Sequence, residues 1–296
     1  MCIITEEEQE AIQHRLSISK TNIFAHHTRP GFQAVVYSMS IVSSTRTAMI
    51  LPVPVVVGSG EDALRFIDLS GYANFFDDLR RACKPEYEPP LDWDADDTFC
   101  SAETLVVHEV GDYEASYVPA MSDFNRLDPR FRLPEEIWKK MPDYSDYGFA
   151  VFQLKITLSA SGSETENTVH PMAFEFPTRN REKLFYPTVH VHDGDYHSKA
   201  GFNHMLYCQR DNARSEFKYQ TDLFNNLPPT TAVTTDVVDG LPTFYGYNWF
   251  YRSDDVASES MRIDKCEGVI EPNKKIYAMS LSGNHSNCDI WLGDSA

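Results

Sequence analysis

The chain of 296 residues lacks a long apolar run, and its start lacks a secretory signal pattern. A helix that crosses a bilayer needs about 20 consecutive apolar residues. Residues 1–13 contain no basic region followed by an apolar core, which a secretory signal would require. We therefore expect a protein that does not span a membrane and that resides in the cytoplasm.

The cysteines do not form any closely spaced pair of the Cys-x-x-Cys type. Such pairs mark zinc ribbons and redox motifs, and regularly spaced cysteines mark disulfide frameworks. Scattered cysteines in a long chain are typical of free thiols in a reducing compartment. The six cysteines are Cys2, Cys83, Cys100, Cys208, Cys266 and Cys288.

Basic residues are scarce relative to acidic ones, and the formal net charge is −18 with histidine neutral. A charge of this sign repels the phosphates of nucleic acids and anionic lipids, and no Lys/Arg cluster opposes it. We therefore expect neither nucleic acid nor membrane as a partner. The apolar fraction of 42% predicts a globular protein, whose partner would be another protein or a small molecule.

No nucleophile elbow, phosphate-binding loop or His-Glu-x-x-His motif is present in the sequence. Gly58 to Ala63 matches Gly-x-Gly-x-x-Ala, but prolines precede it and a short strand pattern follows, so we interpret it as a glycine turn. Cys2 could serve as an amino-terminal nucleophile after removal of Met1, although the charged segment that follows is not the buried strand that such enzymes use.

Alternating β-branched and aromatic residues dominate much of the chain. Phe32 to Ile41, then a Ser/Thr-rich turn, then Ala48 to Pro54 predict a hairpin, with Pro52 and Pro54 at a sheet edge or leaving the sheet. Helices are expected at 5–16, at 71–83 and within 125–141. The fold class predicted is α+β, mainly antiparallel β-sheet with a few peripheral helices.

The predicted hairpin has a counterpart later in the chain. Residues 151–158, a Ser/Thr-rich turn and residues 171–177 repeat the design of two strands, the second ending in proline. The acidic, proline-rich segment 84–97 is the best internal boundary. We therefore predict two related halves, 1–97 and 98–296, the second containing a histidine-rich stretch; one single body is the alternative.

Histidines gather in residues 184–209. Tyr186 to Asp193 predicts a strand that enters a turn, and alternate residues of a strand share a face. His190 and His192 should therefore project together, away from Val189 and Val191. Two imidazoles on one strand face can supply two ligands to a divalent metal such as zinc, iron or manganese.

A metal-dependent enzyme, a hydrolase or oxygenase, could be built on this pair. His197 or Asp193 would complete the ligand set, and Asp195 or His204 would act as base or as a partner that orients a ligand. The pair resembles the His-x-His of cupins, in which a glutamate follows, whereas here only Asp195 is near. The alternative is that these histidines are half-exposed residues of an antiparallel strand whose valines point inward.

Several short motifs together resemble a bacterial family known only as a domain of unknown function. The matching pieces are Ala48 to Pro54 with its Pro-x-Pro, Val110 to Tyr113 as Val-Gly-x-Tyr, and Tyr147 to Phe149 followed by Lys155. The resemblance covers residues 22–177. It implies a secreted protein with an amino-terminal cysteine, at odds with the missing signal, and it brings no activity.

Two functions follow as hypotheses. The first is a binding protein without catalysis that uses sheet faces or edges, and it is favoured because catalytic motifs are missing from the sequence. The second is the metal-dependent enzyme with His190, His192, Asp193 and His197 as candidate ligands.

Overall fold

The computed structural model describes residues 3–6, 17–42, 47–85, 108–110, 113–127, 132–154, 167–168, 170–191, 194–213, 216, 236–238, 241–243 and 250–293. These residues are rich in strand, contain few and short helices, and form mostly antiparallel pairs. The predicted β-rich α+β class is confirmed at this level. Within the described residues, no helix is long and apolar enough to cross a membrane.

Sheet A has five strands in the order β1-β4-β9-β8-β7, and each of its pairs is antiparallel. The strands are β1 (Ile3–Glu6), β4 (Thr47–Val53), β9 (Gly148–Leu154), β8 (Tyr113–Val118) and β7 (His108–Val110). β1 pairs with β4 only as far as Ile50. Pro52 lies beyond that pairing and Pro54 beyond the strand, as proline's missing donor predicts.

Sheet B is larger, with the order β5-β11-β3-β2-β13-β17-β16-β6 and β10 paired beside β3. Its strands are β5 (Arg65–Ile67), β11 (Met172–Pro177), β3 (Phe32–Val42), β2 (Ser17–Arg29), β13 (Lys199–Cys208), β17 (Tyr277–Ser286), β16 (Phe250–Ser253), β6 (Cys83–Pro85) and β10 (Asn167–Thr168). β2 and β13 run parallel, so the sheet is mixed. Two small sheets join β12 (Leu184–Tyr186) to β18 (Ile290–Leu292) and β14 (Asp236–Val238) to β15 (Leu241–Thr243).

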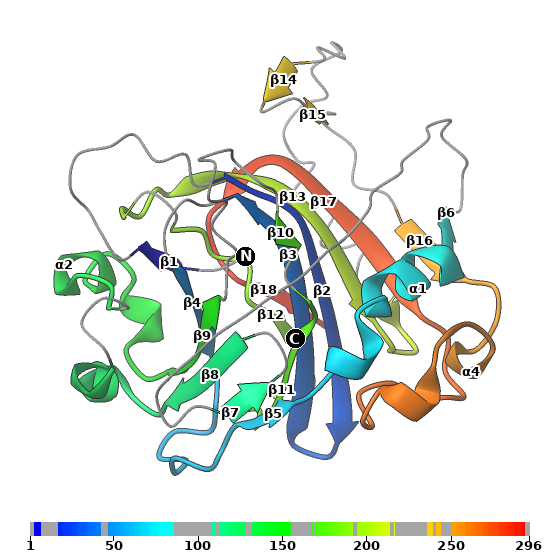
Figure 1. Cartoon of the computed structure of the whole chain (residues 1–296), viewed down its shortest axis with the longest axis horizontal. Coiled ribbons are helices and arrows are strands. Elements are labelled where there is room, and N and C mark those ends of the chain that lie inside the picture. The colour runs from blue at the N-terminus through cyan, green and yellow to red at the C-terminus, as the bar shows by residue number, and fades with distance from the viewer. Residues whose placement is uncertain are drawn as a thin grey trace.

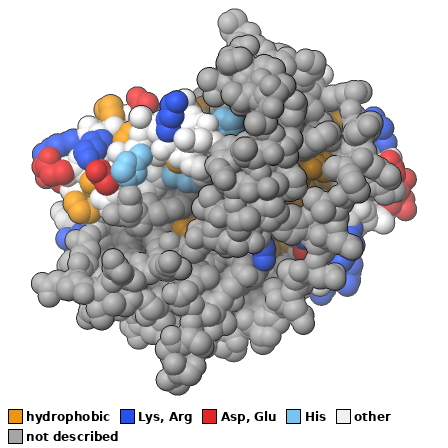
Figure 2. All heavy atoms as spheres, turned by 90° about the horizontal axis from the view of Figure 1, so that it is seen from above, with side chains coloured by type: hydrophobic (Ala, Val, Ile, Leu, Met, Phe, Trp, Pro, Cys, Tyr) orange, Lys and Arg blue, Asp and Glu red, His pale blue; other side chains and the backbone are white. Residues whose placement is uncertain are grey.

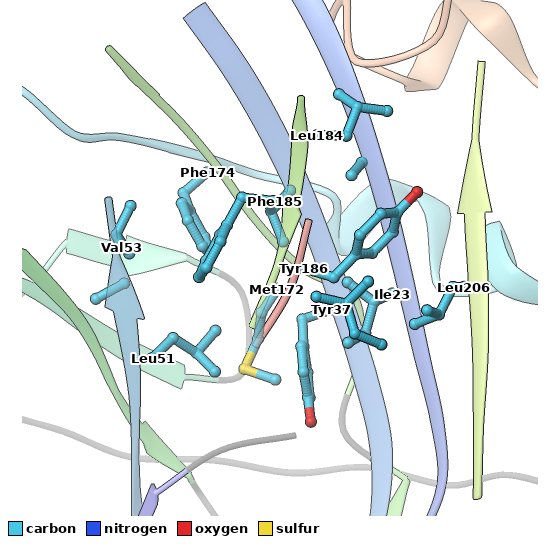
Figure 3. Packing of buried hydrophobic residues seen from close by; sticks show 14 of the residues in the cluster. Ile23, Tyr37, Leu51, Val53, Met172, Phe174, Leu184, Phe185, Tyr186 and Leu206 are labelled. Atoms are coloured by element: carbon cyan, nitrogen blue, oxygen red, sulfur yellow. The ribbon is translucent and has the colours of Figure 1, made fainter. Parts of the chain in front are cut away.

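The main core lies between the two sheets. Val35 and Tyr37 of β3 belong to the same buried cluster as Leu51 of β4 and Phe152 of β9, so the facing sides of both sheets contribute. β12 adds its residues to this cluster, and Figure 3 shows Leu184, Phe185 and Tyr186 among side chains of both sheets.

Short helices cover the outer face of each sheet (Figure 1). On sheet B, α1 (Phe75–Ala82) and α4 (Ala257–Ser260) pack with the 3-10 turns η1 (Ser70–Tyr72) and η5 (Ile263–Lys265) over Phe24 and Tyr207. On sheet A, α2 (Glu135–Trp138) packs with η2 (Met121–Arg126) and η4 (Pro142–Tyr144) over Phe149. The helix predicted at 71–83 corresponds to η1 and α1, and the one within 125–141 to α2.

The expected hairpin of β3 and β4 is wrong. β3 lies in sheet B between β2 and β11, whereas β4 lies in sheet A between β1 and β9. All seven residues of β4 are buried, so the side chains on both of its faces must be shielded from water. A strand inside a sheet that has packed layers on both sides meets this requirement. The second predicted hairpin is divided in the same way, with β9 in sheet A and β11 in sheet B. The strands of the two similar segments pair with each other, β3 with β11 and β4 with β9.

The helix predicted at 5–16 and the boundary predicted at 84–97 lie only partly within the described residues. Residues 3–6 form β1, so the helix predicted from Thr5 is wrong at its start, and the rest of 5–16 lies outside the described residues. The predicted acidic segment 84–97 lies outside them from residue 86 onward. Sheets A and B each combine strands from before and after residue 97.

Candidate functional site

The histidine-rich stretch begins as a strand but does not continue as one. β12 ends at Tyr186, and residues 187–190 are not part of a strand, so the strand predicted for 186–193 is wrong over these residues. Val189 and Val191 do point inward, into the cluster that covers sheet A. The sequence pattern therefore predicted correctly that Val189 and Val191 are buried. Hydrogen bonds from side chains, described next, take the place of the expected pairing with a neighbouring strand.

Asn287 makes the first set of these contacts. Its side-chain oxygen accepts a hydrogen bond from the backbone N–H of His190 at 2.7 Å, and its amide nitrogen donates to the carbonyls of His190 at 2.8 Å and His197 at 2.7 Å. The side chain is almost fully buried. One carboxamide thus provides the donor and the acceptor that a neighbouring strand would supply.

Asp289 makes the second set. One carboxylate oxygen accepts from the backbone N–H groups of Thr188 at 2.7 Å and Val189 at 2.9 Å, and the other accepts from the Tyr144 hydroxyl at 2.8 Å. Burial raises the pKa of Asp289 to about 6, although these three donors favour its charged form. Burial also raises the pKa of Tyr144, which stays protonated and can donate.

His190 and His204 come together beside Phe202, a residue of the main core. Their rings stack with centroids 5.3 Å apart and an interplanar angle of 19°, and His190 lies 4.4 Å from the Phe202 ring. His204 is buried on the inner face of β13, and its Nδ1 accepts the backbone N–H of Asn203. His285 of β17 lies 5.9 Å from the same phenylalanine ring.

The remaining candidates lie elsewhere. Asp195 forms an ion pair with Lys140 and accepts the backbone N–H of Tyr196, and the lysine holds the pKa of Asp195 below its usual value. A carboxylate held charged in this way is a weak base. His197 is exposed.

His192 and Asp193, two of the four predicted metal ligands, lie outside the described residues. Among the residues that are described, no three His, Cys, Asp or Glu side chains gather in a group that could hold a metal ion. His190 and His204 are thus the two candidates brought into contact, and they were predicted for different roles.

Sequence reasoning missed the residues that shape this region. Asn287 and His190 are 97 positions apart, and Asp289 and Thr188 are 101 apart. Neither side chain belongs to a motif, so a single sequence contains no signal for the contact. Gln33 is another example, since its buried carboxamide bonds to both the N–H and the carbonyl of Phe185.

β13 and β17 pair as an antiparallel two-stranded ribbon, and at one end of this ribbon one face is exposed to solvent. Lys199, Gly201 and Asn203 of β13 pair with Ser286, Asn284 and Ser282 of β17, and all but the partly buried Ser282 are exposed. Further along the same face, Tyr207 and Ala278 are buried under the α1 and α4 layer. Figure 2 shows histidine, lysine and acidic side chains gathered at one end of the visible face. We call the six paired residues the ribbon face.

No model of a known protein family matches the chain. Among solved structures, the chain is similar to the crystal structure of baculovirus P35, with a TM-score of 0.46 and 13% sequence identity over 100% of both chains. It is also similar to a chain in the crystal structure of the caspase-8/P35 complex, with a TM-score of 0.41 and 14% identity over 93% of this chain and 96% of that one. A mutated baculovirus P35 after caspase cleavage, at 2.7 Å resolution, gives a TM-score of 0.40 and 12% identity over 94% and 100%. With TM-scores below 0.5, these likenesses carry no argument about the activity or partners of this chain.

Proposed function

We propose that this protein is a binding protein that acts without catalysis and that the ribbon face is its binding surface. The observation that carries the proposal is the contrast along one pair of strands. Half of the outer face of β13 and β17 is buried under helices, while the ribbon face is exposed and bears small polar side chains on a regular, paired backbone. Because the backbone is fixed by pairing, little conformational entropy is lost when a partner binds.

The ribbon face favours a partner with a polar, hydrogen-bonding surface. Its asparagine and serine side chains offer donors and acceptors, and Lys199 adds a positive charge. The net charge of −18 disfavours nucleic acid and anionic membrane. A protein or a small polar molecule remains the expected partner class.

The test compares an altered ribbon face with an altered surface elsewhere. Asn203→Arg and Asn284→Arg place bulky charges on the ribbon face, and Asn125→Arg makes the same change at an exposed position of η2. Quantitative affinity purification should find a partner that binds the wild type and Asn125→Arg but is lost from both ribbon variants. The partner must then bind the purified protein in calorimetry with the same pattern. Equal recovery by all four proteins would contradict the proposal.

A metal-dependent enzyme, a hydrolase or oxygenase, is the second candidate function, and one observation favours it. The stacked rings of His190 and His204 bring two imidazoles side by side. His190 and His192 would hold a zinc, iron or manganese ion, with His197 or Asp193 completing the set. His204 is the better-placed candidate for a base or orienting partner, since Asp195 is paired with Lys140.

A further inference from the structure

Another histidine, outside the stacked pair of His190 and His204, lies in a polar cluster of its own. His26 of β2 is buried, and its Nδ1 lies 3.2 Å from the backbone carbonyl of Gln209. A carbonyl oxygen only accepts hydrogen bonds, so Nδ1 bears the proton in the neutral ring. The other nitrogen, Nε2, then has a lone pair and faces Glu271, whose Oε2 lies 3.6 Å away.

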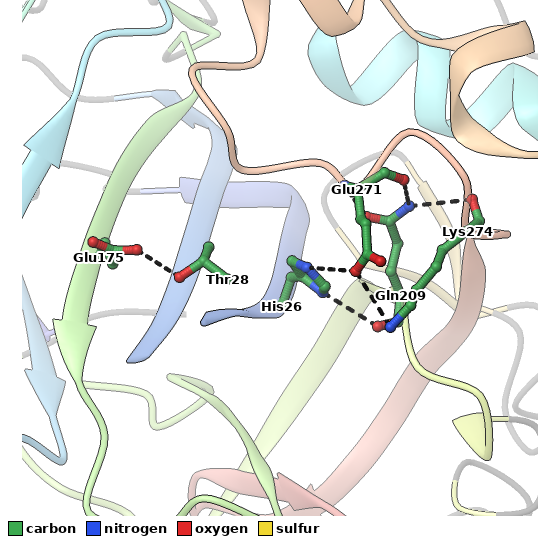
Figure 4. Close-up of polar contacts among 6 residues, drawn as sticks. All are labelled: His26, Thr28, Glu175, Gln209, Glu271 and Lys274. Carbon is green, nitrogen blue, oxygen red and sulfur yellow. Dashed lines mark hydrogen bonds and ion pairs between the residues drawn. The ribbon is translucent and has the colours of Figure 1, made fainter. Parts of the chain in front are cut away.

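The same carboxylate oxygen of Glu271 has a competing partner. Lys274 Nζ lies 3.2 Å from Oε2, closer than His26 Nε2 does (Figure 4). A neutral Nε2 offers this oxygen no proton, whereas the ammonium offers a full charge. The observed geometry, with the lysine nearer, is what the neutral state of His26 should give.

The turn that contains Glu271 and Lys274 is tied to the rest of the molecule. The side chain of Gln209 accepts the N–H of Glu271 at 2.7 Å and donates to the carbonyls of Glu271 at 2.8 Å and Lys274 at 3.2 Å. The backbone carbonyl of Lys274 also accepts a hydrogen bond from the backbone N–H of Ala257, at the start of α4. The turn therefore connects the residue that follows β13 with the helical layer over sheet B.

We propose that Glu271 is a proton-dependent switch, which pairs with Lys274 while His26 is neutral and moves onto His26 Nε2 when that ring is protonated. Protonation turns Nε2 into a charged donor, and a charge-assisted hydrogen bond inside a buried cluster is stronger than an exposed ammonium pair. The change needs only a rotation of the partly exposed Glu271 side chain. No backbone bond of the turn has to break.

The charged and titratable groups around His26 set the range in which the switch operates. Burial lowers the pKa of His26 from its ordinary value of 6.5, the Gln209 carbonyl and Glu271 raise it, and Lys274 lowers it. His27 on the same strand faces Arg210, which is in turn paired with the buried Glu216, and the Phe24 ring lies beside His26. The exchange of partners therefore takes place below pH 6.5. Among the described residues, Glu271 is the acceptor found on the Nε2 side.

Nuclear magnetic resonance on the full chain tests the exchange directly. Ring nitrogen shifts of His26 would be followed from pH 8 to pH 4, together with the backbone amides of residues 271–274. We expect the Nδ1–H form at neutral pH and amide shifts in the turn that follow the His26 midpoint. Lys274→Met should raise that midpoint because a repelling charge and a competitor are removed, and Glu271→Gln should lower it.

Two results would overturn the proposal. One is a His26 midpoint that does not change in Lys274→Met, whose altered side chain is partly exposed and whose turn carbonyl is kept. The other is a His26→Asn variant whose 271–274 amides titrate as they do in the wild type, since the turn would then respond to Glu271 alone. If His26→Asn does not fold, the Lys274→Met comparison decides.

Discussion

At the scale of single residues, buried carboxamide side chains make the backbone hydrogen bonds that a neighbouring strand would otherwise make. Gln33, Gln209 and Asn287 each bond to both the N–H and the carbonyl of a residue that is remote in sequence. Each pairing satisfies a backbone donor and acceptor that would otherwise be buried without partners. Such residues look like ordinary polar side chains in the sequence, yet they hold segments in place.

Asn287→Asp should therefore destabilise the protein strongly although it changes only one side-chain group. The new oxygen would face the carbonyls of His190 and His197, where the amide now donates, and a charge would be buried beside them. We expect a loss of about 2–4 kcal/mol, from two broken hydrogen bonds and unsatisfied acceptors. Urea unfolding measures it.

The matched control lies on the same strand end. Asn284→Asp makes the same change at an exposed position, and its free energy of unfolding should stay within about 0.5 kcal/mol of the wild type. Equal losses in the two variants would show that the bonds of Asn287 contribute nothing specific.

The partly buried His27 should make stability depend on pH. Burial lowers the pKa of His27 to about 4, with Arg210 and His26 adding to the shift. Since the folded pKa lies below the unfolded value near 6.5, the contribution is present above pH 6.5 and is lost as the pH falls toward 4. Asp289 acts in the opposite direction, because its pKa is raised to about 6 and its folded form gains stability as the pH falls through that value.

His27→Gln isolates the histidine contribution. The thermal midpoint of this variant should fall less than that of the wild type between pH 7 and pH 4.5, while the exposed His197→Gln should follow the wild type. A variant slope as steep as that of the wild type would assign the acid sensitivity to other groups.

At the scale of elements, the sequence indicated which segments are strands better than it indicated their neighbours. The apolar and β-branched residues of 32–41 and 48–54 predict β3 and β4, because strand preference is set largely by the residues of the segment itself. Pairing is not local: β4 is apolar on both faces, and nothing in its own residues says that its partners are β1 and β9. For the same reason His190 and His204 could be named as candidates, but their stacking could not be predicted, and no role could be assigned to Asn287 or Asp289.

The pairing of β8 with β9 depends on a glycine. A Cβ added to Gly148 would lie 2.5 Å from the Tyr117 hydroxyl oxygen and 2.7 Å from its Cε2 atom. Gly148→Ala should therefore cost about 1–3 kcal/mol of unfolding free energy, as overpacking does. Tyr117→Ala removes the obstructing ring. The double variant Gly148→Ala/Tyr117→Ala should therefore have the same free energy of unfolding as Tyr117→Ala alone.

Gly201 provides the control for this substitution. A Cβ there meets no atom within 4 Å, so Gly201→Ala should change stability by less than about 0.5 kcal/mol. A Gly148→Ala variant as stable as Gly201→Ala would mean that Tyr117 moves aside without penalty.

At the scale of the whole molecule, the two sheets share one core. Phe152 of β9 contacts the rings of Phe66 and Phe174 from sheet B and of Tyr113 from its own sheet. Because neither sheet can bury these rings alone, we expect sheets A and B to unfold together.

Phe152→Ala tests this coupling. The loss of a large buried ring should cost about 3–5 kcal/mol. The transitions seen by circular dichroism and by tryptophan fluorescence should move to lower urea together, because Trp138 lies over sheet A and Trp291 next to the core between the sheets. Separate transitions for the two probes would instead indicate units that unfold independently.

The central claim is that the protein binds a partner and carries out no metal chemistry at its histidines. Its most direct test is the metal content of untagged protein by plasma mass spectrometry, beside a His190→Ala/His192→Ala variant. We expect no stoichiometric metal in either protein. Zinc, iron or manganese near one ion per chain in the wild type, and absent from the variant, would contradict this claim and show the metal site that the enzyme alternative requires.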